Sequence, residues 1–507
     1  MPSVRNRTIA NSRAIIQMIS LTNQMQSRFY SLAGRAKYLL FEHQFVYTVR
    51  IGLAVTSILL TVLAVALMSR NPVYGLVAVG AVAACFVFVF VWHYMEITVF
   101  LLIVVSTVVN PVIPRDITVT LLLLILLGFV WILKLLISGS FQSVRPAPPN
   151  KAAVLFIVAV IISYIWSSIY ADPNIVHMQN DKFLPRLITG LVMILSPLAM
   201  LLFGNFMKTT AAMKRVVWYY LIFGAVVLLL HILPVTVSLS FINAGGQLPA
   251  WVTIFALSQV LYNKDIPRWL KLGLWLLVAG WLYVQFWEGR TWVSGWLPAF
   301  VGIAVLVLLR SRLLFAAAVA VAMIAAVANI EMIEEMIEAE RQESGDTRLA
   351  AAMFFVDVTA EHYLFGTGPT GPYFYLLTYG RGLQLSHNNY VDIITQTGIF
   401  GFVSWILLWG SICWTAWKNY RAGLTHGFEA GLSAALLAIS AVTLLIMALG
   451  DWVTPFTYTQ SVRGVSYTIW PWLWAGLSIA LYAQIQARKQ DSQSQRGVVA
   501  ELNKDVV

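Results

Sequence analysis

The chain of 507 residues is 59% hydrophobic and only 11% charged. This composition excludes a soluble globular domain, a disordered chain and a disulfide-rich scaffold, and it indicates a polytopic membrane protein. The 33 Lys and Arg exceed the 22 Asp and Glu and give a formal net charge of +11, but the basic residues lie at the ends of apolar segments and do not form a patch for nucleic acid. Cys85 and Cys413 each lie in a long apolar run, so neither is assigned to a disulfide and the redox compartment stays open.

The first 45 residues are basic and lack the apolar core of a signal peptide. Ile15, Met18, Ile19 and Thr22 follow a helical period. This segment is therefore either a helix on the membrane surface or a basic tail that only helps to set the topology.

Apolar segments of about 20 residues predict helices that cross the membrane. Fourteen candidates follow one another along the chain, at 46–68, 73–92, 97–109, 117–137, 152–166, 187–203, 216–233, 251–262, 270–287, 292–309, 313–330, 390–414, 430–449 and 467–485. The segments 97–109 and 251–262 are short, so the number of spans is 12 or 14. The sequence thus predicts an all-α polytopic membrane protein.

The basic residues orient these spans. With the N-terminus in the cytoplasm, most Lys and Arg fall on the inner side, as the positive-inside rule requires, and most acidic residues fall outside. Both termini are then cytoplasmic. The predicted organisation is a basic N-terminal segment, a bundle of about 11 spans, an external helical loop, three last spans and a disordered cytoplasmic tail, at 1–45, 46–330, 331–389, 390–486 and 487–507.

The external loop is the one long segment predicted outside the bilayer, and long ordered loops usually carry function. Its first part, 331–342, predicts an acidic amphipathic helix. A second helix is expected at 347–362, where four apolar side chains would pack one face onto the bundle. They are Leu349, Met353, Phe354 and Val358.

The residues that follow, 366–371, match the spacing Gly-x-Gly-x-x-Gly. No buried strand precedes them, so the sequence does not favour a dinucleotide site. Gly366 and Gly368 either permit a tight turn or let the backbone approach a bulky ligand.

One histidine and two glycines then follow with the spacing His-Asn-x9-Gly-x2-Gly. His387 and Asn388 precede the span 390–414, in which Gly398 and Gly401 lie one turn apart. Asn388 predicts a helix N-cap, which would hold His387 at the outer mouth of the bundle. The two glycines predict a close approach by a neighbouring helix.

At these residues the sequence resembles the O-antigen ligase and O-antigen polymerase superfamily. The Gly-Arg-Thr at 289–291 is similar to the family's Ser-Arg-Gly pattern, with Gly in place of Ser and no Gly after Arg290. Arg348, followed by Tyr-Leu-Phe-Gly-Thr-Gly at 363–368, is similar to a second pattern, in which relatives have Pro where this chain has Tyr363. The His-Asn-x9-Gly-x2-Gly element that begins at His387 is the third.

The resemblance implies a glycan transferase that moves an oligo- or polysaccharide from undecaprenyl diphosphate to an acceptor hydroxyl, with inversion and without a cofactor or metal. It implies His387 as the base and Arg290 and Arg348 as a clamp for the diphosphate, at the outer face of the bacterial plasma membrane. Histidine is mostly neutral at neutral pH, and arginine forks match phosphate oxygens. Further candidates for substrate binding are Asn388, Gly366, Gly368, Tyr390, Lys182 and Arg186.

Partners expected from this resemblance are the lipid-linked donor, a glycan, lipid or protein acceptor, the bilayer and other proteins of polysaccharide assembly. Nucleic acid is not expected. Two other functions stay open, a polysaccharide transporter or flippase and a non-catalytic assembly partner. A transporter is disfavoured because the charges lie at the ends of the spans and not at mid-membrane. Whether the enzyme is a ligase or a polymerase depends on the acceptor, which the sequence does not specify.

Overall fold

The computed structural model describes residues 55, 72–108, 117–138, 144–175, 183–233, 245–341, 346–380, 386–424, 427–455, 457 and 461–504. The chain forms two compact units, Met1–His93 and Tyr94–Val507. The predicted N-terminal segment 1–45 lies outside the described residues. So does the first candidate span, 46–68, apart from Val55.

In the first unit, the described chain forms the apolar helix α2 (Pro72–His93). The helices of the second unit up to the predicted external loop are α3 (Met95–Val108), α4 (Val119–Ser138), α5 (Pro148–Ile169), α7 (Phe183–Phe206), α8 (Thr210–Ile232), α9 (Leu248–Tyr262), α10 (Arg268–Leu282), the π-helix η2 (Tyr283–Glu288), α11 (Val293–Arg310) and α12 (Arg312–Ala328). Those from the loop onward are α13 (Ile330–Glu340), α14 (Asp346–Glu361), α15 (Gly371–Tyr379), α16 (Asn389–Arg421), α17 (Gly427–Leu449), the short 3-10 helix η4 (Ser461–Gly464) and α19 (Val465–Lys504).

The length and hydropathy of these helices confirm the predicted all-α polytopic membrane fold. Eight helices of the described chain are long and apolar enough to cross a membrane, or up to ten if each bent pair is one span. The predicted span 251–262 corresponds to α9, which has 15 residues and is shorter than each of these eight helices. The total of 12 or 14 spans stays a prediction.

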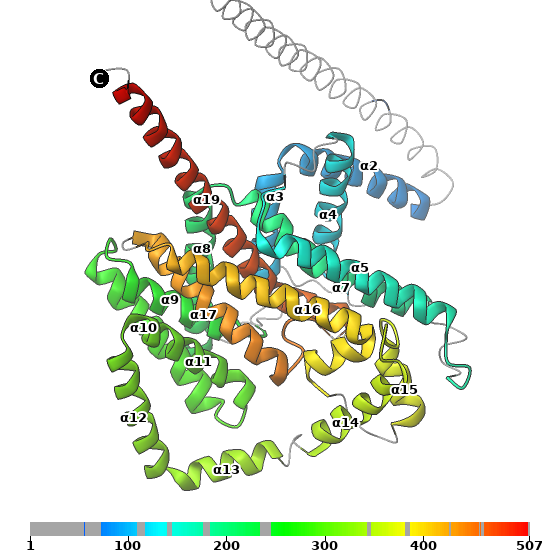
Figure 1. Ribbon diagram of the computed structural model, residues 1–507. Helices are drawn as coiled ribbons and strands as arrows, with labels where there is room; N and C mark the ends of the chain where they lie inside the picture. Colours follow the sequence, from blue (N-terminus) through cyan, green and yellow to red (C-terminus); the bar gives the residue numbers. More distant parts are fainter. Residues whose placement is uncertain are drawn as a thin grey trace, which may run out of the picture. The chain divides into compact units, whose positions relative to one another are not determined.

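The core of the second unit lies where α5, α16 and α19 meet. α16 packs along α5, and α19 packs along α7 (Figure 1). Trp405 and Trp472, whose ring centroids lie 5.6 Å apart, are fully buried between these helices together with Phe156. The large aromatic side chains bury much apolar surface at this centre. They hold α16, which carries the His-Asn-x9-Gly-x2-Gly element, against the bundle.

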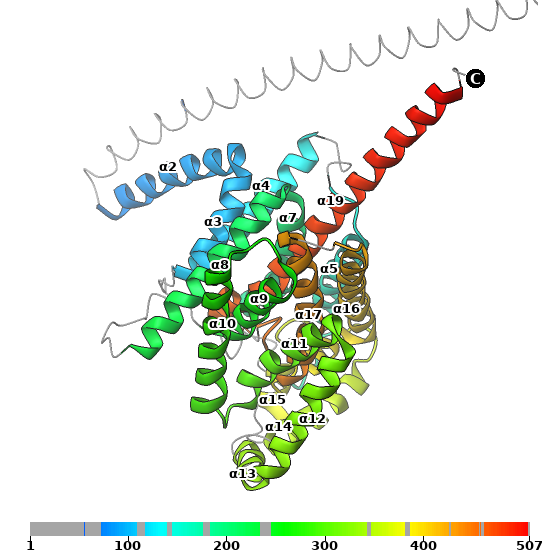
Figure 2. The same ribbon diagram turned by 90° about the vertical axis from the view of Figure 1, so that its left-hand side faces the viewer.

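The predicted external loop begins with α13 and α14, which confirm helices at the predicted positions. In Figures 1 and 2, α12, α13 and α14 follow one another along the end of the bundle opposite to the far end of α19. The expected packing face of α14 is partly wrong. Leu349 and Met353 are 64% and 63% exposed, whereas Ala351 and Phe355 are buried against α16. The face of α14 that contains the small residue Ala351 packs against α16, so Leu349 and Met353 point away from this contact.

The tail predicted as disordered at 487–507 is helical as far as Lys504, because α19 continues past the predicted span without a break. The sequence of this extension is polar, but it is rich in Gln, Arg, Ala and Lys, which are good helix formers. The structure therefore differs from the predicted disorder, which was inferred from polarity alone.

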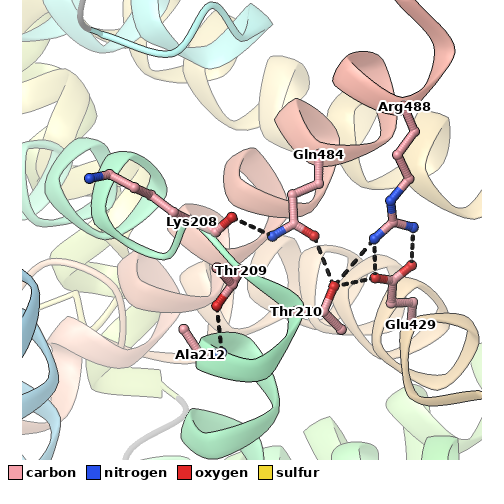
Figure 3. Close-up of polar contacts among 7 residues, drawn as sticks. All are labelled: Lys208, Thr209, Thr210, Ala212, Glu429, Gln484 and Arg488. Carbon is pink, nitrogen blue, oxygen red and sulfur yellow. Dashed lines mark hydrogen bonds and ion pairs between the residues drawn. The ribbon is translucent and has the colours of Figure 1, made fainter. Parts of the chain in front are cut away.

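At the end of the bundle where α8 and α17 begin, a polar cluster joins them to α19 (Figure 3). The guanidinium of Arg488 donates to both carboxylate oxygens of Glu429, at 2.6 and 2.7 Å. Thr210 Oγ1 donates to Glu429 at 2.5 Å, and Gln484 Nε2 donates to the carbonyl of Lys208 at 2.9 Å. The topology predicted from the sequence assigns these segments to the cytoplasmic side, and their meeting at one end agrees with it.

Candidate active site

His387 lies at the entrance to α16. The side chain of Asn388 accepts hydrogen bonds from the backbone N–H groups of Tyr390, at 2.9 Å, and Val391, at 3.3 Å. This confirms the predicted N-cap. His387 has a φ of 45°, in the left-handed region that few residues with a side chain adopt. The cap and this backbone conformation fix the histidine at the end of the helix, with its side chain 35% exposed.

A buried carboxylate stands beside this histidine. Asp451 Oδ1 lies 3.8 Å from His387 Nδ1, and the Asp451 side chain is only 3% exposed. The second oxygen, Oδ2, is buried and has no hydrogen-bond partner in the described part of the chain. An imidazole with a carboxylate on the Nδ1 side is the usual arrangement of a base and the group that orients it.

Asn389 fixes the segment that carries this carboxylate. It is fully buried; its amide nitrogen donates to the carbonyl of Thr454 at 2.8 Å, and its oxygen accepts the N–H of Val453 at 3.1 Å. The residue after His-Asn therefore ties the start of α16 to the chain that follows α17. Sequence reasoning missed Asp451, although one signal was present: it is an acidic residue directly after a predicted span, on the predicted outer side.

Arg348 lies in the first turns of α14, half-buried. One turn further along, Ala351 and Phe355 pack against Val391 in the first turn of α16. The hydroxyl groups of Thr359 and Thr395 then meet at 2.9 Å. α14 thus runs beside the half of α16 that begins next to His387, and Arg348 is carried on it.

Arg290 is exposed and lies between the π-helix η2 and α11. Its carbonyl accepts a hydrogen bond from Trp296 Nε1 at 3.1 Å. Two residues on, Trp292 contacts Trp452 with ring centroids 5.9 Å apart, and Trp452 follows Asp451. Glu288, a possible neutralising partner for Arg290, pairs instead with His231 at 2.9 Å.

The elements that carry Arg290, Arg348 and His387 therefore converge at one end of the second unit. They do so through neighbours: Trp292 contacts the segment that holds Asp451, and α14 packs beside the start of α16.

The glycine-rich loop at 366–371 completes a broken helix. Within α16, Gly398 has a φ of 63° and a ψ of −169°, so the helix is interrupted there. The freed carbonyls of Thr395 and Gln396 accept the N–H groups of Thr367 and Gly368, each at 2.9 Å. The freed N–H of Ile399 donates to the carbonyl of Tyr363 at 2.7 Å. A broken span in a membrane needs such partners, because lipid offers none.

Glycine is required on both sides of this junction. A Cβ atom added to Gly398 would lie 2.4 Å from the carbonyl oxygen of Leu364, and one added to Gly366 would lie 2.4 Å from that of Gln396. Both have positive φ. The sequence predicted that Gly398 and Gly401 lie in one continuous helix and admit a neighbouring helix. At Gly398 the structure differs, because a loop and not a helix makes the close approach.

The remaining predicted binding residues fall into three groups. The backbone N–H groups of Gly366 and Gly368 are used within the protein, and the Tyr390 hydroxyl donates to the carbonyl of Leu444 at 2.8 Å. Arg186 is buried beside the glycine-rich loop. Lys182 lies outside the described residues.

Beneath the external loop, a second polar contact joins α15 to the chain after α5. Tyr375 Oη lies 2.5 Å from His362 Nε2 and 3.3 Å from Asp172 Oδ2. Burial lowers the pKa of His362, while the nearby carboxylates of Glu361 and Asp172 oppose this shift. Burial raises the pKa of Tyr375. The neutral forms of both side chains therefore suit this contact.

Among the described residues no group of three or more His, Cys, Asp or Glu is placed to hold a metal ion. Metal independence stays a prediction.

Residues 269–406 match the family model described as O-antigen ligase. This supports the resemblance to the O-antigen ligase and polymerase superfamily, and the matched segment includes Arg290, Arg348, His387, Gly398 and Gly401. Asp451 and Arg186 lie outside it and reach it only through the fold. No curated protein matches the chain.

Proposed function

We propose that this protein is a membrane glycan transferase of the O-antigen ligase and polymerase type, which moves an oligo- or polysaccharide from undecaprenyl diphosphate to an acceptor hydroxyl. One observation carries the proposal. His387, in the segment that matches the O-antigen ligase family, lies at a helix entrance with the buried Asp451 carboxylate 3.8 Å from its Nδ1. Two arginines sit on elements that converge on the same end.

In the proposed reaction, His387 Nε2 takes the proton of the acceptor hydroxyl as its oxygen attacks the anomeric carbon of the donor sugar. The new carbon–oxygen bond forms as the bond to the diphosphate breaks, and the electron pair leaves on the diphosphate. Asp451 stabilises the imidazolium that results. A single displacement of this kind inverts the anomeric carbon.

Arg290 and Arg348 hold the leaving diphosphate in this mechanism. Guanidinium groups stay charged and donate two parallel hydrogen bonds to phosphate oxygens. The exposed Arg290 and the half-buried Arg348 are well suited to a ligand whose head lies at the membrane surface. The charge that develops on the diphosphate is thereby neutralised without a metal ion.

We infer the plasma membrane as the location, with both termini in the cytoplasm and the reaction at the outer face. The positive-inside bias supports this orientation. So does the clustering of the segments assigned to one side, with Glu429 and Arg488 at one end and His387 and Asp451 at the other.

The test is an assay with purified protein, an undecaprenyl-diphosphate oligosaccharide and a glycan acceptor, without divalent metal. Free undecaprenyl diphosphate should appear together with an elongated acceptor of inverted anomeric configuration. Arg290→Lys should lose most of this activity, because an ammonium group does not reproduce the fork. Turnover that a chelator abolishes and a metal restores contradicts the metal-free mechanism. Unchanged turnover in Arg290→Lys removes this arginine from the clamp.

A further inference from the structure

Arg186 is a buried cation in the first turn of α7. It is 6% exposed. Its Nη2 donates to the hydroxyl of Ser167, and its guanidinium carbon lies 5.6 Å from the ring centroid of Tyr164. Within the described chain, its buried Nε has no hydrogen-bond partner and no carboxylate forms an ion pair with it. A charge removed from water without a counter-ion is costly.

The described surroundings of Arg186 are neutral hydroxyl groups and the backbone of the glycine-rich loop. A Cβ atom on Gly368 would lie 3.0 Å from Arg186 Nη2, so only glycine lets the loop come this close. The hydroxyls of Thr189 and Thr370 meet at 2.6 Å next to it. The N–H groups of Gly368 and Thr370 are already taken by Gln396, so an anion here would be bound chiefly by the guanidinium.

This position is separate from the histidine. Gln396, the residue of α16 that receives the loop beside Arg186, lies seven positions after Asn389. At 1.5 Å per residue this is about 10 Å along the helix. The loop beside Arg186 therefore meets α16 at a point about 10 Å along the helix from the end next to His387.

We propose that Arg186 is the centre of a second anion site, which takes a phosphoryl group. The planar guanidinium fork with an unused Nε–H matches phosphate oxygens, and the first turn of a membrane-spanning helix lies at the depth of lipid phosphates. That the phosphoryl group belongs to the polyprenyl carrier rests on the proposed function. That the site binds a phosphoryl group at all does not.

The experiment measures binding, not turnover. The full-length protein with Arg290→Gln and Arg348→Gln is titrated with inorganic pyrophosphate by calorimetry, and in a second arm with undecaprenyl diphosphate in mixed micelles. Saturable binding should remain in at least one arm, and adding Arg186→Gln should weaken it at least about 10-fold, as expected for a charge-assisted pair. Binding in both arms indicates recognition of the phosphoryl group itself, and binding in the lipid arm alone indicates a lipid headgroup.

Two control variants distinguish binding at Arg186 from nonspecific and structural effects. Arg421, which lies over the ring of Trp417 at 5.7 Å, is a matched arginine on an aromatic ring, and Arg421→Gln should leave binding unchanged. Arg186→Met should unfold at a midpoint temperature no lower than the wild type without ligand, because it removes a buried charge that no carboxylate of the described chain pairs with. Pyrophosphate should raise the midpoint of the wild type and not that of this variant.

The proposal is overturned if Arg186→Gln leaves the affinity unchanged, or if Arg186→Met lowers the midpoint equally with and without pyrophosphate. The latter marks Arg186 as a purely structural residue. A failed transferase assay with binding that still depends on Arg186 contradicts the proposed function and leaves this site standing.

Discussion

The charged residues at the two ends of the second unit differ in how completely they are hydrogen-bonded. At the end shown in Figure 3, both oxygens of Glu429 accept hydrogen bonds from Arg488, and a threonine hydroxyl adds another. At the other end, a buried oxygen of Asp451 and a buried N–H of Arg186 have no hydrogen-bond partner among the described residues.

This difference distinguishes polar residues that join helices from polar residues that we propose to act on a ligand. A saturated ion pair has no capacity left for a substrate and serves to join α17 to α19. Buried charges whose hydrogen bonds are incomplete cost free energy, and a fold keeps them where a ligand or a reaction uses them. At this second end, the backbone of the loop 363–368 and that of the broken α16 exchange hydrogen bonds. These bonds form a backbone frame, beside which the buried Asp451 and Arg186 keep polar atoms that the described residues do not hydrogen-bond.

The largest expected effect is that of a substitution at His387. His387→Ala should lower the transfer rate about 100- to 10,000-fold, the range expected for the loss of a general base. Its thermal midpoint should stay within a few degrees of the wild type, because the side chain is 35% exposed. Initial rates and unfolding curves, at matched expression, measure the two quantities. A fully active variant makes the protein a non-catalytic partner or assigns the base elsewhere.

The frame itself is tested by Gly398→Ala. The φ of 63° and the backbone contact at 2.4 Å predict that this variant lowers the free energy of unfolding by roughly 2–4 kcal/mol. Gly410→Ala, in the same helix with no atom within 4 Å of the added Cβ, is the matched control and should be neutral or slightly stabilising. Equal unfolding temperatures for the two variants would show that the break in α16 carries no strain.

Asp451→Asn sharpens the role of the carboxylate beside the histidine. The amide keeps the shape and removes the charge, so transfer should slow about 10- to 100-fold, by analogy with other groups that orient a catalytic or ligating histidine. A transfer rate equal to that of the wild type would reduce Asp451 to a structural residue.

The saturated end should respond weakly. Glu429→Gln leaves Arg488 with a neutral partner, and because the arginine side chain is 54% exposed the expected loss is only about 0.5–1 kcal/mol. Transfer activity should not change. A loss of activity with intact folding would show that the end with Glu429 and the end with His387 are coupled.

The smallest effect is a pH dependence from His362. Its pKa is lowered in the folded protein, so the unfolded chain binds the extra proton first as the pH falls. The contribution of His362 to stability is present above about pH 6.5, the ordinary histidine value, and is lost as the pH falls through and below it. Unfolding temperatures of wild type and His362→Gln between pH 5 and 8 should diverge in this way, and parallel curves would contradict it.

Much of the molecule follows from the sequence because it depends on local pattern. Apolar length predicts the spanning helices, a polar residue before an apolar run predicts the Asn388 cap, and periodicity predicts α13 and α14. The motif residues Arg290, Arg348 and His387 are found in the same way, since they lie in short recognisable patterns and within the matched segment.

Only the tertiary structure decided what these patterns pack against. The break of α16 at Gly398 depends on a loop about 30 residues earlier that supplies its hydrogen bonds, and helical periodicity carries no sign of it. Asp451 reaches His387 from 64 positions away, and Arg186 becomes a buried charge only once α5, α7 and the glycine-rich loop meet. Hydropathy and spacing determine which segments enter the membrane, whereas charge pairing and burial are properties of contacts between distant segments.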